Sequence, residues 1–136
     1  MMELTGDVTR TAGILLLTVV AVEYGGLFMF AIHSGRREFT DFQKASFRAG
    51  HAHAGVLVIL SLVALIYVDS LDLSGLAAVV GRSAIPLAAI LIPAGFFLGA
   101  IGSGRTKPNR FRYLVYLGAL SLGVGVVTLG LALLLG

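Results

Sequence analysis

The chain has 136 residues, of which 57% are hydrophobic and only 12% are charged, and its mean hydropathy is +0.97. A soluble domain carries about twice that charged fraction, so the composition excludes an ordinary water-soluble protein and fits a chain solvated by lipid. The net charge of +3 does not indicate nucleic-acid binding, because the basic residues gather in two short connections between apolar runs. The absence of cysteine excludes disulfides, thiolate metal sites and cysteine nucleophiles.

Four apolar runs follow one another along the chain, each close to the ~20 residues that a helix needs to cross a bilayer. The runs are continuously apolar, which favours helices over the alternating strands of a membrane barrel. We expect an all-α, integral membrane four-helix bundle in a single domain, with helices at about 11–33, 42–68, 83–101 and 113–135. Asp41 is a candidate cap for the second helix, and the first run is predicted to be a transmembrane helix rather than a cleaved signal.

The connections between the runs differ in charge. Eight of the ten Lys and Arg residues lie in the first and third connections, 34–49 and 102–112, whereas the second connection, 69–81, holds Asp69 and Asp72. Basic residues near the ends of membrane spans favour the cytoplasmic side. We therefore expect a multi-pass protein of the cell membrane, with loops 34–49 and 102–112 in the cytoplasm and both termini outside.

Glycine is abundant in the spans. Small residues let helix backbones approach closely in lipid, so the last helix is expected to pack against another helix, in the same subunit or in a neighbouring one, through Gly118, Gly123, Gly125 and Gly130. Gly25 and Gly26 in the first run are expected to do the same, or to make room for a flat ligand.

One acidic residue lies near the middle of a predicted span. An ionisable side chain inside a membrane costs several kcal/mol and is a candidate for function. Glu23 must find a partner, stay protonated or face a polar cavity. The structural alternative is a protonated Glu23 that is hydrogen-bonded to a neighbouring helix.

The histidines give the second chemical signal. His33 ends the first run and is expected at the membrane interface, while His51 and His53 precede unbroken apolar sequence. Residues two apart on a helix point ~200° away from each other, and a zinc site on a helix prefers a spacing of four. His51 and His53 are therefore expected to have separate roles, and one of them suits an axial haem ligand.

Haem fits the remaining features better than a bare metal ion does. Its ring is large and apolar, and its two carboxylates need cations at the membrane edge. The basic residues of the first connection lie on the histidine side of the membrane, and one helix face carries Lys44, Arg48, His51 and Gly55. The alternative is that these basic residues only fix the topology.

The stretch Arg48-Ala49-Gly50-His51-Ala52-His53-Ala54-Gly55 resembles the Ala-Arg-Ala-His-Ser-Gly stretch of styrene oxide isomerases. These are small four-helix membrane enzymes that use haem b as a Lewis acid to convert an aryl epoxide into an aldehyde. The first run is similar to the family's first helix in its glycine-leucine stretches, and so is Gly95-Phe96-Phe97-Leu98 in the third run. The resemblance implies haem b bound through its iron to His53, a small apolar substrate, and a homo-oligomer, a trimer with haem near the subunit interfaces.

The sequence departs from the family at its polar active-site positions. When the family's positions are aligned on His53 and Gly95, its Asn corresponds to Ile59, its Asp to Ala89 and its Tyr to Phe97. Other polar groups would have to orient the substrate, and the candidate catalytic residues are Glu23, Tyr24 and Tyr116, with Tyr113 as a further substitute.

The leading hypothesis is a haem b membrane protein that isomerises a small apolar epoxide to an aldehyde, with the iron as Lewis acid. A haem protein for redox or gas sensing is the alternative if His51, or a histidine from elsewhere, supplies a second axial ligand. An alternative from another class is a small proton-coupled transporter, or an accessory membrane subunit, that uses Glu23.

Overall fold

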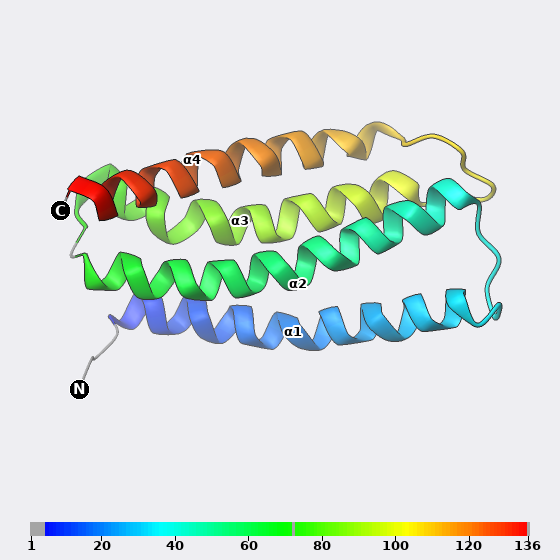
Figure 1. Ribbon diagram of the computed structural model, residues 1–136, viewed down its shortest axis with the longest axis horizontal. Helices are drawn as coiled ribbons and strands as arrows, with labels where there is room; N and C mark the ends of the chain where they lie inside the picture. Colours follow the sequence, from blue (N-terminus) through cyan, green and yellow to red (C-terminus); the bar gives the residue numbers. More distant parts are fainter. Residues whose placement is uncertain (1–4, 72, 136) are drawn as a thin grey trace.

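The computed structural model describes residues 5–71 and 73–135, so Asp72 lies outside the described residues. The chain forms four helices and a short 3-10 helix, η1 (Arg110–Arg112), in the order shown in Figure 1: α1 (Gly6–His33), α2 (Asp41–Ser70), α3 (Gly75–Ala100) and α4 (Tyr113–Leu135). Within these residues there is no strand, which confirms the all-helical prediction. All four helices are long and apolar enough to cross a membrane, as in a multi-pass membrane protein.

Three helix starts differ from the expectation, and the first of them is that of α1, which begins at Gly6 rather than near residue 11. α2 begins at Asp41, but its N-cap is Thr40, whose hydroxyl accepts from the backbone N–H of Gln43 while the Gln43 side chain accepts from the backbone N–H of Thr40. α3 begins at Gly75 rather than near residue 83. Gly81 is not part of a loop: a Cβ there would lie 3.0 Å from Val68 Cγ2, so this glycine allows α3 to pack closely against α2.

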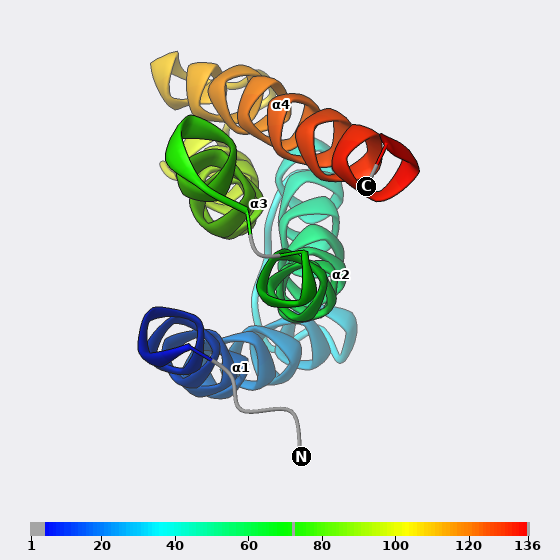
Figure 2. The same cartoon turned by 90° about the vertical axis from the view of Figure 1, so that its left-hand side faces the viewer.

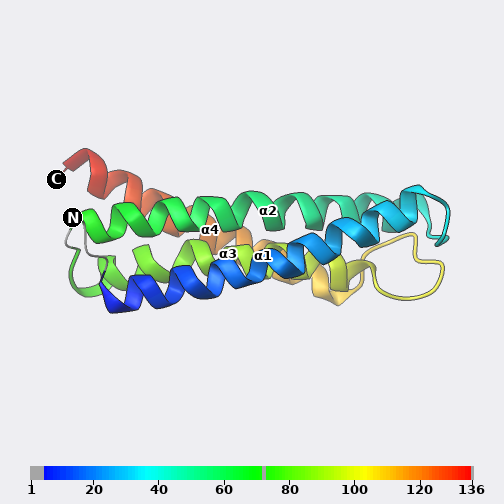
Figure 3. The same cartoon turned by 90° about the horizontal axis from the view of Figure 1, so that it is seen from below.

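The helices form an open bundle in which neighbours in sequence are neighbours in space. α2 packs against α1 and α3, and α3 packs against α2 and α4. Figure 2 shows α1 and α4 at opposite edges of this arrangement with α2 and α3 between them. α1 crosses α2 obliquely, as seen from below in Figure 3. As a result most side chains of α1 remain exposed, with only Val8 and Leu15 of this helix buried.

The closest helix contact is between α3 and α4. A Cβ at Gly118 would lie 2.6 Å from Ile92 Cγ1, and a Cβ at Gly125 would lie 2.8 Å from Ile85 Cγ1. The expected close packing of the last helix is therefore confirmed for these two glycines. Gly123 and Gly130 point elsewhere, because added Cβ atoms would meet nothing within 4 Å.

α1 contributes Leu15 to the core along its length and has further polar and aromatic contacts near its two ends. At its start, the backbone N–H and the hydroxyl of Thr5 both donate to Asp69 Oδ1, at 3.1 and 2.8 Å. Near its other end, Phe28 packs edge-on against Phe39 and Phe47, with ring centroids 5.8 and 5.4 Å apart. These contacts hold α1 beside α2 and leave space between α1 and α3.

Candidate functional site

The two histidines of α2 lie on opposite sides of this helix. His51 faces α1, where a Cβ added to Gly25 would come within 3.2 Å of its Nδ1. His53 lies against α3 instead, with its ring centroid 5.2 Å from that of Phe96. The two imidazoles therefore cannot bind one ion between them, as their spacing predicts. The room left by Gly25 and Gly26 is taken by the His51 ring.

His53 is held in one orientation by the backbone. Its Nδ1 lies 2.7 Å from the carbonyl oxygen of Ala49, and the side chain is exposed. In the tautomer that donates from Nδ1 to this oxygen, Nε2 is left free on the outer side of α2. Histidines that bind metals usually donate their other ring N–H to a carbonyl or carboxylate in this way. The His53 imidazole is thus oriented as an axial ligand would be.

The other predicted cofactor residues face α1 rather than the His53 side. Lys44 and Arg48 line a cavity of 520 Å³ together with His33 and other residues of α1. An added Cβ at Gly55 would lie 4.0 Å from Val22 of α1. The face of α2 that turns toward α1 therefore carries Lys44, Arg48, His51 and Gly55, as the sequence predicts. His53 is not on this face.

The candidate catalytic residues are not brought together within one copy of the chain. Glu23 and Tyr24 are exposed on α1, whereas Tyr116 is exposed on α4 at the opposite edge of the bundle, with its ring 6.1 Å from that of Tyr113. The positions that match the family's polar residues are also separated. Ala89 and Phe97 line the space between α1 and α3, while Ile59 is 65% exposed.

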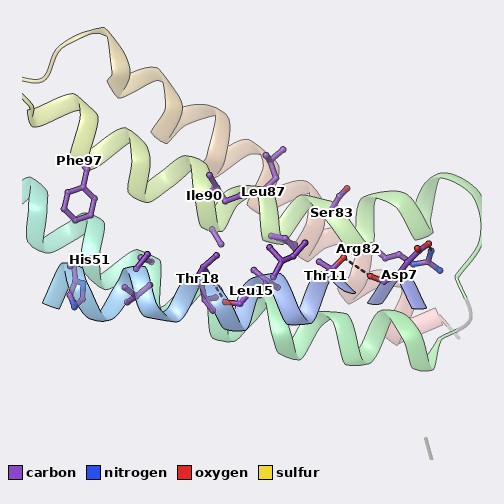
Figure 4. A pocket seen from close by; sticks show the side chains of 18 of the residues that line it. Asp7, Thr11, Leu15, Thr18, His51, Arg82, Ser83, Leu87, Ile90 and Phe97 are labelled. Atoms are coloured by element: carbon purple, nitrogen blue, oxygen red, sulfur yellow. Dashed lines mark hydrogen bonds and ion pairs between the residues drawn. The ribbon is translucent and has the colours of Figure 1, made fainter. Parts of the chain in front are cut away.

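A long groove of 740 Å³ lies between α1 and α3, with residues of α2 also lining it. Its size is within the range of small-molecule sites, roughly 300–1,000 Å³. Figure 4 shows Asp7 and Arg82 at one end and His51 and Phe97 at the other. The part between these ends is lined mainly by apolar side chains, among them Ile14, Leu15, Val58, Leu87 and Ile90.

The polar end of the groove contains a charged pair that bridges α1 and α3. Arg82 Nη1 lies 3.8 Å from Asp7 Oδ2. Arg82 Nε is buried and has no hydrogen-bond partner among the described residues. The predicted third helix, 83–101, does not include Arg82, so this pair was not expected; Arg82 and Arg10 are the two basic residues outside the basic connections.

No group of three or more His, Cys, Asp or Glu side chains within residues 5–71 and 73–135 is arranged to hold a metal ion. A haem needs one such ligand only, so the fit rests on a single histidine. No protein-family model, curated protein or solved structure matches the chain.

Proposed function

We propose that the protein is a multi-pass protein of the cell membrane that binds haem b through His53 and isomerises a small apolar epoxide. The observation that carries the proposal is the hydrogen bond between His53 Nδ1 and the Ala49 carbonyl, at 2.7 Å. It leaves Nε2 free on an exposed part of α2, which is where an axial ligand must present it. Bound haem would supply a Lewis acid for the epoxide oxygen.

The chain's own residues would bind the ring and exclude water. Phe96 packs beside the imidazole of His53, and the neighbouring outer face of α2 is apolar, with Val56 and Ile59 each 65% exposed. A haem ring covering this face would be shielded from water and from lipid headgroups. Exclusion of water would protect a reactive cation from being captured by it.

The proposed site is completed by a second copy of the chain. Glu23, Tyr24 and Tyr116 lie on the outer faces of the bundle, and within one copy they are on helices at its two edges. A homo-oligomer, for which we propose a trimer, would place such residues of one copy beside His53 of the next. In the proposed orientation the basic connections 34–49 and 102–112 face the cytoplasm and both termini lie outside.

Visible absorption spectra of the purified protein test the haem proposal. We expect a Soret band that is lost in His53→Ala, because the axial ligand is removed, and that returns when imidazole is added to this variant. His51→Ala is the matched control, since it removes a histidine two residues away that faces α1, and it should keep the band.

Three results would count against the proposal. A protein that stays colourless when haem is supplied would overturn it, and loss of the band only in His51→Ala would move the ligand to the α1 side. A spectrum typical of two strong axial ligands would exclude substrate binding at the iron and favour the redox alternative. With a haem-loaded protein, conversion of an aryl epoxide to an aldehyde is then measured directly.

A further inference from the structure

The groove between α1 and α3 has polar groups gathered at one end and an apolar interior. Asp7, Thr11, Arg82 and Ser83 lie at the polar end. The hydroxyl of Thr11 donates to the Asp7 carbonyl at 2.9 Å and that of Ser83 to the Val79 carbonyl at 2.6 Å. Both hydroxyl protons are thus used by the helices, and the guanidinium of Arg82 is left as the donor that this end offers to a ligand.

Arg82 has an unsatisfied donor at the polar end. Its Nε is buried without a hydrogen-bond partner in the described part of the chain, although the side chain as a whole is 35% exposed. A buried donor without a partner is energetically unfavourable. Its pair with Asp7 is long, at 3.8 Å, and the Asp7 side chain is 86% exposed, so Asp7 competes weakly for the guanidinium. Nε itself is closed off by protein atoms, so an oxygen acceptor entering the groove would bind the Nη groups, which the 35% exposure of the side chain leaves accessible.

The remainder of the groove suits a single chain better than a helix. On α1 its lining residues extend from Asp7 to Gly25, which at ~1.5 Å per residue is about 27 Å, close to the ~30 Å thickness of a bilayer's hydrocarbon core. Helices approach each other in lipid through small residues, and Ala21 and Ala89 are among the lining residues. Bulky Ile14, Leu87 and Ile90 interrupt these small positions, and the His51 ring covers Gly25.

We propose that this groove binds a single-chain amphiphile, with the oxygen acceptor of its head on Arg82 and its apolar chain running toward His51 and Phe97. A fatty-acid carboxylate and the ester carbonyl of a monoacylglycerol both provide this chemistry. The site goes beyond the proposed haem function, and His53 does not line it, although Ala89 and Phe97, which match polar positions of the resembled family, do.

Electron paramagnetic resonance of spin-labelled lipids tests the proposal with the full chain in phosphatidylcholine nanodiscs. The probes are stearic acid labelled near the end of its chain, the monoacylglycerol of the same labelled acid, and labelled phosphatidylcholine as the reference for lipid that merely surrounds the protein. We expect the immobilised fraction to be several-fold larger for at least one single-chain probe than for the reference.

Two variants and a control locate the binding. Arg82→Gln should weaken binding about tenfold, the effect of losing one hydrogen bond from a charged donor. Ala21→Phe places a ring in the groove from an exposed position of α1 and should abolish the preference. Ala119→Phe makes the same change at an exposed position of α4 and should behave as wild type.

The outcomes separate the ligands and the two proposals. Preference for the acid alone identifies a carboxylate head, and preference for both probes identifies a carbonyl acceptor. Equal immobilisation of all three lipids, or a wild-type preference in Ala21→Phe, overturns the proposal even if Arg82→Gln fails to fold. Soret spectra of the same samples report on the haem independently, since Ala21 and Arg82 line the groove rather than the His53 side.

Discussion

The buried amide of Gln43 joins the start of α2 to the end of α3. Its Nε2 donates to the carbonyl oxygens of Ala100 and Gly102, at 2.9 and 2.7 Å, and the residue is only 2% exposed. The last carbonyls of a helix have no partner within the helix. Gln43 supplies one from 57 residues away in sequence, and so fixes how α2 and α3 align at this end.

We expect Gln43→Leu to lower the free energy of unfolding by about 1–3 kcal/mol, because buried carbonyls lose their donor. The control is Ala45→Leu, which adds the same side chain at an exposed position of the same helix. Thermal unfolding in detergent, followed by circular dichroism, measures both variants. Equal midpoints would show that water or detergent replaces the amide.

Among individual residues, what the sequence could predict depends on whether the feature is local. The opposite directions of His51 and His53 follow from helix geometry alone, and the structure agrees. The scattering of Glu23 and Tyr116 over distant helices could not be predicted, because it depends on which helices pack together. The hydrogen bond of His53 to Ala49 is local, but it depends on a side-chain rotamer that sequence does not specify.

At the level of the elements, three glycines bring α3 and α4 together: Gly95 on α3, and Gly118 and Gly125, seven residues apart, on α4. Gly118 and Gly125 face Ile92 and Ile85, and the backbone nitrogens of these isoleucines would lie 3.0 and 3.2 Å from the added Cβ atoms. A methyl group at either position would force the two backbones apart. Gly123 is on the same helix and meets no atom within 4 Å.

Gly118→Ala is therefore expected to destabilise the protein by about 1–3 kcal/mol, the usual cost of overpacking. Gly123→Ala should be neutral or stabilising by up to ~1 kcal/mol, because alanine is the better helix former. Unfolding by sodium dodecyl sulfate, monitored by circular dichroism, compares the pair. Stability of Gly118→Ala equal to that of wild type would contradict the close contact.

The helices themselves were predictable because long apolar runs suffice to define them, and α4 has the bounds expected. The start of α3 was not, since Gly75 and Gly81 are typical of a turn in sequence, whereas Gly81 packs against Val68. Tertiary packing, not local preference, decides such cases. The groove was missed for the same reason: it arises from the separation of α1 and α3.

For the whole molecule, the proposed orientation is open to a direct test because the chain has no cysteine of its own. Ser103 lies in the third connection and Ser74 in the second, and both are exposed. In intact cells, a membrane-impermeant maleimide should label Ser74→Cys and spare Ser103→Cys until the cells are permeabilised. The reverse pattern would invert the topology and place the basic connections outside.

α1 forms one side of the groove and is little buried, with only Val8 and Leu15 of this helix covered by the rest of the molecule. α1 contributes only these two residues to the buried core that it shares with α2 and α3, and the Asp7–Arg82 pair also joins it to α3. Bending α1 outward would remove Val8 and Leu15 from this core, but it would leave the close contact between α3 and α4 intact. Such a movement of α1 would open the groove between α1 and α3 to the bilayer, so that a molecule dissolved in lipid would enter it laterally without passing through water.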